Sequence, residues 1–203
     1  TAFLAALLSR PALAKAIRQR DKQLHRQLHE LENYEVQPTG REKKSEPPKV
    51  KPAQFLLAAE DYQPLLSAMS SRVMDTSLLG ARCLALLGDA RAFGTLLQLS
   101  REEDVDARVQ VCQALAALAD PRASGRLETL TGDDAAEVRD AAYTALENIY
   151  ADDPLEAADI GLTSQHTDVR RRALKTLSAT VRKSKAKKID PRARALMLRA
   201  LND

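Results

Sequence analysis

A phrase repeated at a fixed distance is the feature that most constrains the fold of this chain. The segments "LLGDARA" (Leu86–Ala92) and "ALADPRA" (Ala117–Ala123) share four of their seven residues in the same order and lie 31 positions apart. The same spacing aligns apolar residues in columns, of which one holds Leu84, Leu115, Leu146 and Leu177, another holds Leu56, Leu87, Leu118 and Ile149, and a third holds Leu65, Leu96 and Leu127. A period of this length is typical of helical repeat proteins, in which each unit stacks on its neighbours.

Each unit of the period is predicted to be a pair of helices. Within residues 105–135, apolar side chains recur at steps of three or four and predict one helix. Asp120-Pro121 then predicts the start of a second helix, because Asp caps helices and Pro is tolerated at their first position. Asp153-Pro154 repeats this cap two residues late. Since one pair cannot bury its apolar face alone, the pairs are expected to stack.

These patterns predict an all-α fold, an α-solenoid of about four to five helical hairpins. The expected units lie near residues 53–73, 74–104, 105–135, 136–166 and 167–203. Residues 1–35 are expected to form an N-terminal helical element outside this register, and residues 36–52 a charged, proline-containing linker. Only 3% of the chain is aromatic, so Ala and Leu must supply the core, and both favour helix. Because the first residue is Thr rather than Met, we expect a segment of a longer polypeptide.

The net charge of +3 conceals a segregation of charge along the chain. Residues 53–164 carry 8 basic and 19 acidic side chains, whereas residues 165–203 carry 12 basic and 3 acidic ones. Residues 1–52 are also basic, with 11 basic and 6 acidic side chains. An acidic body between basic ends points to charged partners.

The two cysteines and the absence of long apolar runs suggest where the protein works. Cys83 and Cys112 lie within helical apolar patterns and lack the spacing of a metal site or a disulfide framework. We expect them to be buried thiols in a reducing compartment. No apolar run reaches the ~20 residues that span a bilayer, and the opening "TAFLAALL" lacks a basic segment before it. A cytoplasmic protein without membrane contact is therefore expected.

The repeat resembles a known family. Two short helices, an Asp-Pro between them, and the helix openings "EVRDAAYTALENI" and "DVRRRALKTLSAT" look like HEAT repeats. The similarity is to the short HEAT-like class found in phycobilisome lyases and in many bacterial scaffold proteins. It covers residues 71–181 well, and 53–70 and 190–203 loosely. The resemblance implies a binding platform, although the class also includes enzymes.

The residues that could serve catalysis or metal binding are better explained by structural roles. His25 and His29 lie four apart, as zinc ligands can on a helix, but they lack a third ligand. The pair His29-Glu30 resembles the iron-binding pairs of HEAT-like deoxyhypusine hydroxylases, which need several such pairs spread over their repeats. The acidic clusters at residues 102–106, 133–134 and 152–153 precede predicted helices, where carboxylates cap and complement the helix dipole. The sequence therefore predicts no enzyme, no metal, no cofactor and no small-molecule substrate.

Three arginines occupy one position of successive repeats. Arg108, Arg139 and Arg170 each lie near the start of an Ala- and Leu-rich helix. Residues at one repeat position lie in a row on a solenoid, so this ladder could form a binding stripe. Alternatively, each Arg could bridge to the acidic turn of the neighbouring repeat through charge-assisted hydrogen bonds. We expect the bridging role.

The basic C-terminal region is the strongest functional signal. Its "KSKAKKI" segment is an insertion in the turn between the last two predicted helices. Such a patch attracts phosphate backbones or acidic proteins, although it could also be a merely solvated face. The candidate contacts are Arg170, Arg171, Arg172, Lys175, Arg182, Lys183, Lys185, Lys187, Lys188, Arg192 and Arg194.

The sequence thus supports one main functional hypothesis and two others. The main one is a non-catalytic scaffold or adaptor that binds a protein partner, as part of a larger protein or complex. The alternative is a HEAT-like module that binds nucleic acid through its basic C-terminal surface, for which HEAT-like DNA glycosylases are a precedent. The absence of Trp argues against glycosylase chemistry here. A metal-dependent hydroxylase is the weakest of the three.

Overall fold

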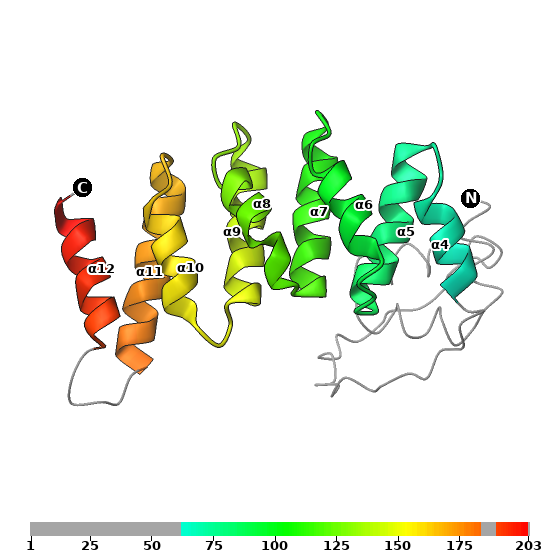
Figure 1. The fold of residues 1–203 in the computed structure, drawn as a ribbon. Helices are drawn as coiled ribbons and strands as arrows, with labels where there is room; N and C mark the ends of the chain where they lie inside the picture. The colour runs from blue at the N-terminus through cyan, green and yellow to red at the C-terminus, as the bar shows by residue number, and fades with distance from the viewer. Residues whose placement is uncertain (1–61, 184–189, 203) are drawn as a thin grey trace, which may run out of the picture.

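The structure is a computed structural model that describes residues 62–183 and 190–202. Within these ranges the chain is helical and contains no strand. Figure 1 shows the helices in a single row, from α4 at one end to α12 at the other. Their bounds are α4 Gln63–Met69, α5 Met74–Leu86, α6 Ala92–Leu99, α7 Val105–Leu118, the 3₁₀ turn η3 Pro121–Ala123, α8 Ser124–Leu130, α9 Ala136–Ile149, α10 Pro154–Leu162, α11 Thr167–Lys183 and α12 Pro191–Asn202.

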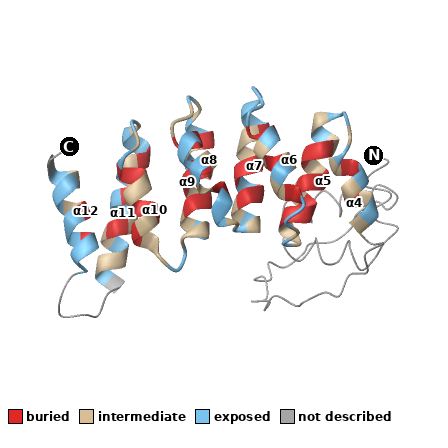
Figure 2. Ribbon diagram, in the orientation of Figure 1, coloured by how far each residue is buried: buried red, intermediate tan, exposed pale blue. Residues whose placement is uncertain are grey.

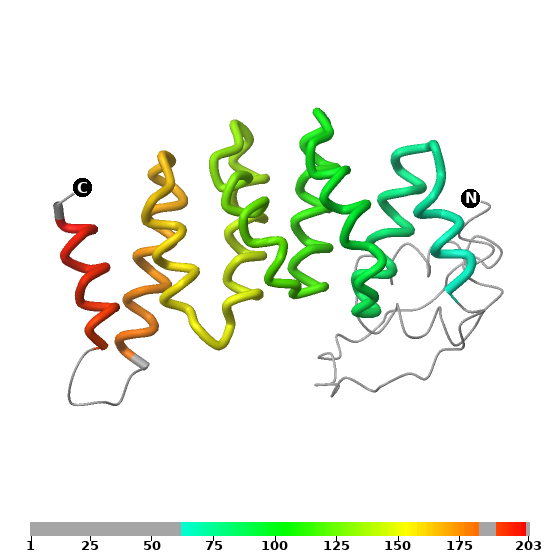
Figure 3. Tube along the Cα trace, in the orientation of Figure 1, coloured from blue at the N-terminus to red at the C-terminus, as the bar shows by residue number. Residues whose placement is uncertain are grey.

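The helices belong to two kinds, which alternate along the chain. We call α5, α7, α9 and α11 the A helices, and α4, α6, α8, α10 and α12 the B helices. The pairs α5/α6, α7/α8, α9/α10 and α11/α12 are the first to the fourth hairpin. Successive A helices pack against one another, above all α7 against α9, and each of α6, α8 and α10 packs against the A helix that follows it. The tube in Figure 3 follows the chain as it alternates between the two kinds. The predicted all-α solenoid is therefore confirmed, and the predictions for residues 1–35 and 36–52 lie outside the described residues.

The core is formed by the columns of leucines that the period aligned. Leu84, Leu115 and Leu146 are fully buried, and Leu177 is 1% exposed. Burying a leucine side chain contributes about 2 kcal/mol. In Figure 2 the buried residues lie on each helix where it faces its neighbours, while most residues of the turns are intermediate or exposed. Each hairpin thus completes its core only through the next hairpin, as expected of a repeat array.

Left-handed backbone ends two of the A helices at the same repeat position. Gly88 has φ 76° and Ala119 has φ 51°, and the two residues lie 31 positions apart. At Ala119 the amide donates to the Leu115 carbonyl at 3.0 Å, which satisfies a helix-terminal acceptor. The equivalent residue of the third hairpin, Tyr150, has φ −99° instead. Its turn takes a different path, which agrees with the late position of Asp153-Pro154.

The aspartates at the helix starts differ in whether their side chains cap the helix. Asp104 accepts a hydrogen bond from the Asp106 amide at 3.0 Å and caps α7, and Asp120 accepts one from the Arg122 amide at 2.9 Å. Asp153 occupies the N-cap position of α10, but its side chain makes no capping bond. The expectation of a side-chain cap at Asp153 is therefore wrong, because its carboxylate binds Arg192 of α12 at 2.9 Å.

One glycine allows α10 to approach its neighbours closely. A Cβ atom on Gly161 would lie against the Tyr143 ring of α9 and 2.7 Å from the Ala173 Cβ of α11. Tyr143 is fully buried, and its hydroxyl has no hydrogen-bond partner in the described structure. The third and fourth hairpins therefore pack around the Tyr143 ring, which leaves room for glycine but for no larger residue at position 161.

Candidate functional site

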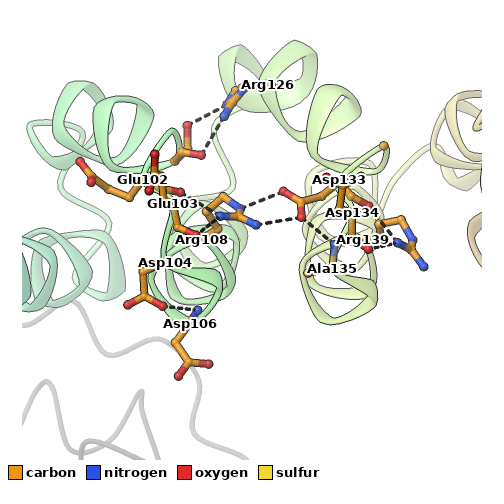
Figure 4. Close-up of polar contacts among 12 residues, drawn as sticks. Glu102, Glu103, Asp104, Asp106, Arg108, Arg126, Asp133, Asp134, Ala135 and Arg139 are labelled. Carbon is orange, nitrogen blue, oxygen red and sulfur yellow. Dashed lines mark hydrogen bonds and ion pairs between the residues drawn. The ribbon is translucent and has the colours of Figure 1, made fainter.

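The turns between hairpins are joined by arginines of the A helices. Arg108 on α7 binds the carboxylate of Asp133, in the turn before α9, through Nε at 2.8 Å and Nη2 at 3.0 Å. Its Nη1 also donates to the carbonyls of Glu102 and Glu103 at 2.9 and 2.7 Å. Figure 4 shows the guanidinium between these two turns. One side chain therefore fixes both the turn before its own helix and the turn of the next repeat.

Arg139 on α9 repeats this arrangement one unit later. Its Nε and Nη2 donate to Asp168 at 2.9 and 2.7 Å, and its Nη1 donates to the carbonyls of Asp133 and Asp134 at 2.8 and 2.9 Å. Arg170 on α11 donates through Nη1 to the Ser164 carbonyl at 2.8 Å. No carboxylate of residues 62–183 or 190–202 pairs with Arg170. Two arginines of the ladder thus form an ion pair with the acidic residue of the next repeat. The third, Arg170, has no such pair among the described residues.

The ion pairs shift the titration of their aspartates. Burial raises the pKa of Asp133, but hydrogen bonds from Arg108 and from the Ala135 amide outweigh burial, so the pKa is lowered overall. The hydrogen bond from Arg139 likewise lowers the pKa of Asp168. Both carboxylates are therefore held in the charged form that the arginines bind.

A second set of arginine contacts joins the B helices and was not anticipated. Arg122 binds Asp120 through its side chain, and its guanidinium lies 4.5 Å from the centroid of the Phe93 ring in the preceding hairpin. Arg91 pairs with Asp89 in the same way and lies 5.1 Å from the Tyr62 ring centroid. The rings of Tyr62 and Phe93 are also 31 positions apart, so the period carried a signal for this contact.

Three members of the predicted basic surface are engaged within the array. Arg172 binds Asp140 and also donates to Glu147 at 2.6 Å and Thr144 at 2.9 Å, all on α9. Arg192 binds Asp153 at 2.9 Å and Glu156 at 3.0 Å. The third is Arg170, which donates to the Ser164 carbonyl. Arg199, which was not among the predicted contacts, binds Asp159 of α10 at 2.5 Å.

The other predicted cations fall into two groups. Four are exposed, and their side chains make no hydrogen bond or ion pair with other described residues: Arg171, Lys175, Arg182 and Arg194. The side chain of Lys183 and the residues Lys185, Lys187 and Lys188 lie outside the described part of the chain. The basic surface is therefore smaller than the count of its residues suggests.

Two open grooves lie along the A helices. The first, of about 510 Å³, runs between α7 and α9 and is lined by Val109, Gln113, Ala116, Ala117, Glu137, Asp140, Ala141, Thr144 and Asn148. The second, of about 470 Å³, lies beside α9, α10 and α11 and is lined by Glu147, Ala151, Pro154, Ala157, Lys175, Thr176, Ala179 and Thr180. We call them the α7/α9 groove and the α9/α11 groove.

The grooves were missed by sequence reasoning, although the repeat contained a signal for them. Ala117 and Ala179 occupy the same repeat position two units apart, and both are exposed. Gln113, Thr144 and Lys175 form the neighbouring column. A column of short or polar residues on the exposed side of successive A helices leaves room between them.

The described residues contain no group of three or more His, Cys, Asp or Glu side chains that could hold a metal ion. Cys112 is fully buried, and burial raises the pKa of its thiol to about 12. No helix of the described chain combines the length and the apolar character that crossing a bilayer requires. The candidate ligands His25 and His29 lie outside the described residues.

Comparison with known proteins identifies the repeat. Residues 62–147 match the family model described as HEAT repeats. This match confirms the resemblance to HEAT-like repeats over α4 to α9, while the phycobilisome-lyase type stays a prediction. No curated protein matches the chain.

Proposed function

We propose that this chain, which is a HEAT-like repeat protein, acts as a non-catalytic scaffold that binds a protein partner along its A helices. HEAT repeats generally serve as platforms for protein interaction. The observation that carries the proposal is the pair of neighbouring grooves between successive A helices. Grooves repeated along an array suit an extended partner, which can contact several hairpins at once.

The lining of the grooves favours a protein over a small molecule. Ala116, Ala117 and Ala141 in one groove and Ala157 and Ala179 in the other leave shallow apolar recesses. Small-molecule sites are usually enclosed and bury most of their ligand, whereas these recesses are open along the array. Apolar side chains of a partner could fill them while its backbone stays outside.

The charges around the grooves would orient the partner. Glu137 and Asp140 line the α7/α9 groove, and Lys175 lines the α9/α11 groove. The Asp140 side chain remains 72% exposed although it pairs with Arg172. A partner with basic residues over α9 and acidic ones over α11 would be complementary, and complementarity of this kind mainly sets orientation and association rate.

Blocking the grooves tests the proposal. Ala117→Arg and Ala179→Arg would place long side chains in the two grooves at exposed positions, which leaves the core unchanged. Proteins that co-purify with the wild-type chain from its native source should be reduced at least fivefold with the double variant, as measured by quantitative mass spectrometry. The matched control is Thr129→Arg with Ala195→Arg, exposed positions on the B helices α8 and α12.

The control variant should retain the wild-type set of co-purifying proteins. Equal recovery by the wild-type chain and the groove-blocked variant, with both folded by circular dichroism, would contradict the proposal.

Nucleic-acid binding is a second candidate, favoured by one observation. Arg171, Lys175 and Arg182 are exposed on α11 at helical spacings of four and seven, so they lie along one stripe. Binding of duplex RNA or DNA through this stripe would weaken steeply with salt and fall when Lys175 and Arg182 are changed to Glu. Absence of binding at low salt would remove this candidate.

A further inference from the structure

A polar bridge at one repeat position joins neighbouring A helices. Between α5 and α7, Arg82 donates through Nη1 to the Gln110 side chain at 2.8 Å. Between α9 and α11, Arg172 donates through Nη2 to the Thr144 hydroxyl at 2.9 Å. Arg82 and Thr144 occupy one column of the 31-residue period. Gln110 and Arg172 occupy another, so each bridge joins the first column on one helix to the second column on the next, and an arginine donates in both.

This bridge is missing between α7 and α9. The residues of the two columns at this boundary are Gln113 and Ala141. Ala141 has no polar group in its side chain, and the exposed Gln113 amide makes no hydrogen bond with other described residues. Both residues line the α7/α9 groove, whose lining contains no basic residue. The groove therefore opens at the boundary where the array supplies no arginine of its own.

The groove combines uncompensated negative charge with apolar surface. Glu137 and Asp140 lie three apart on α9, so they share one side of that helix. The Glu137 carboxylate is exposed and makes no bond with other described residues, and the Asp140 side chain is 72% exposed beside Arg172. Val109 and Ala116 supply apolar lining on α7. A side chain with a methylene stem and a cationic end matches both parts of this lining.

We propose that the α7/α9 groove binds an arginine side chain from a basic segment of the partner protein. The methylene stem packs on Val109 and Ala116. The guanidinium binds the carboxylates of Glu137 and Asp140, and the Gln113 side-chain carbonyl accepts a further hydrogen bond. Arginine suits this set of acceptors better than lysine, because its planar fork directs several N–H groups at once. The inference rests on the proposed scaffold role and names the partner residue that the groove recognises.

Selection from a library of short random peptides tests the proposal. The library is displayed on phage and selected against the immobilised full chain, and peptides that the Ala117→Arg variant also binds are discarded. The peptides that remain should share an arginine. The tightest binder is then labelled with fluorescein, titrated with the full chain at low salt and followed by fluorescence anisotropy. Replacing the shared arginine should weaken binding about tenfold for glutamine and about threefold for lysine.

Variants of the chain test the assigned contacts. Glu137→Gln should weaken binding of the peptide about threefold, and Glu137→Gln with Asp140→Asn about tenfold, because the guanidinium loses its carboxylates. The matched control is Glu103→Gln with Glu128→Gln, which removes two exposed carboxylates outside the groove and should leave the affinity unchanged. Ala141→Arg should abolish binding, because an arginine of the chain then fills the groove. Circular dichroism checks that each variant is folded.

The outcomes separate this proposal from the scaffold role on which it rests. Peptides that need the groove but lack arginine would overturn the arginine proposal and leave the scaffold role standing. So would an affinity that the loss of both Glu137 and Asp140 carboxylates does not change. Recovery of no peptide that Ala117→Arg excludes would also overturn the arginine proposal, and the co-purification experiment then decides the scaffold role independently.

Discussion

Arg108 and Asp133 form a two-point ion pair across a repeat boundary, with Nε–Oδ2 at 2.8 Å and Nη2–Oδ1 at 3.0 Å. The same Oδ1 of Asp133 accepts a hydrogen bond from the Ala135 amide at 2.9 Å, just before α9. The carboxylate of Asp133 therefore both holds the backbone at the start of α9 and attaches that helix to the previous hairpin. Coupling of this kind between neighbours is what makes a stack of hairpins cooperative.

Removing either partner of this pair should destabilise the array. The Arg108 and Asp133 side chains are 14% and 11% exposed, so each would leave a largely buried, unpaired charge behind. We expect Arg108→Ala and Asp133→Ala each to lower the free energy of unfolding by about 2 kcal/mol, with a coupling energy of about 1 kcal/mol in the double-mutant cycle. Urea denaturation measures both quantities. Additive single effects would show that the pair contributes nothing as a pair.

Stability should fall in acid, because the pKa of Asp133 is lower in the folded chain than the ordinary value near 3.9. The unfolded chain then binds the proton more readily, so the stability from this group is present above about pH 4 and is lost as pH falls through the folded pKa. Asp133→Asn should be less stable than wild type at pH 7 and should approach it as pH falls toward 2. A stability difference that stays constant between pH 7 and 2 would exclude Asp133 as the titrating group.

Glycine should give a more stable protein than alanine at position 119. A left-handed conformation costs an L-residue about 1 kcal/mol, and Gly88 already occupies the equivalent position of the previous hairpin. Ala119→Gly is expected to raise the free energy of unfolding by about 0.5 kcal/mol, after the greater entropy of the unfolded glycine is subtracted. Gly88→Ala is the reciprocal test and should destabilise by about 1 kcal/mol. Calorimetry would measure both, and a stabilising Gly88→Ala would contradict the role assigned to the left-handed backbone.

Adding a methyl group at Gly161 should separate the third and fourth hairpins. The new Cβ would meet the Tyr143 ring and lie 2.7 Å from the Ala173 Cβ, both in the core. Overpacking of this kind costs about 1–3 kcal/mol. Gly125→Ala on α8, where nothing lies within 4 Å, is the matched control and should be neutral or stabilising. If both variants melt at the wild-type temperature, the contact with Tyr143 does not limit helix packing.

The fold could be predicted from the sequence because the core repeats with the period. Leu84, Leu115, Leu146 and Leu177 were aligned by spacing alone, and all four are buried. The irregular third hairpin was predicted less well. Tyr150 lacks the left-handed conformation of Ala119, and Asp153 gives its carboxylate to Arg192, 39 residues away. A local capping pattern contains no information about a partner at that distance.

The candidate surfaces show the same division between local and long-range information. Counting charges along the chain identified a basic C-terminal end, but Arg172 is bound by Asp140 and Glu147 of the preceding repeat. Such pairs form only after the hairpins stack, so a count over consecutive residues overstates the exposed positive charge. The grooves depend on the distance between two neighbouring A helices. The side chains of both helices together set that distance.

The most direct measurement for the scaffold role is site-specific photocrosslinking in the native source. A photoreactive phenylalanine analogue is placed either at Ala117, in the α7/α9 groove, or at Thr129, an exposed position of α8. The scaffold role predicts that the probe at position 117 forms a discrete crosslink to a protein partner and that the probe at position 129 does not. Crosslinks of equal yield from both positions, or none from position 117 while a bound partner co-purifies, would contradict it.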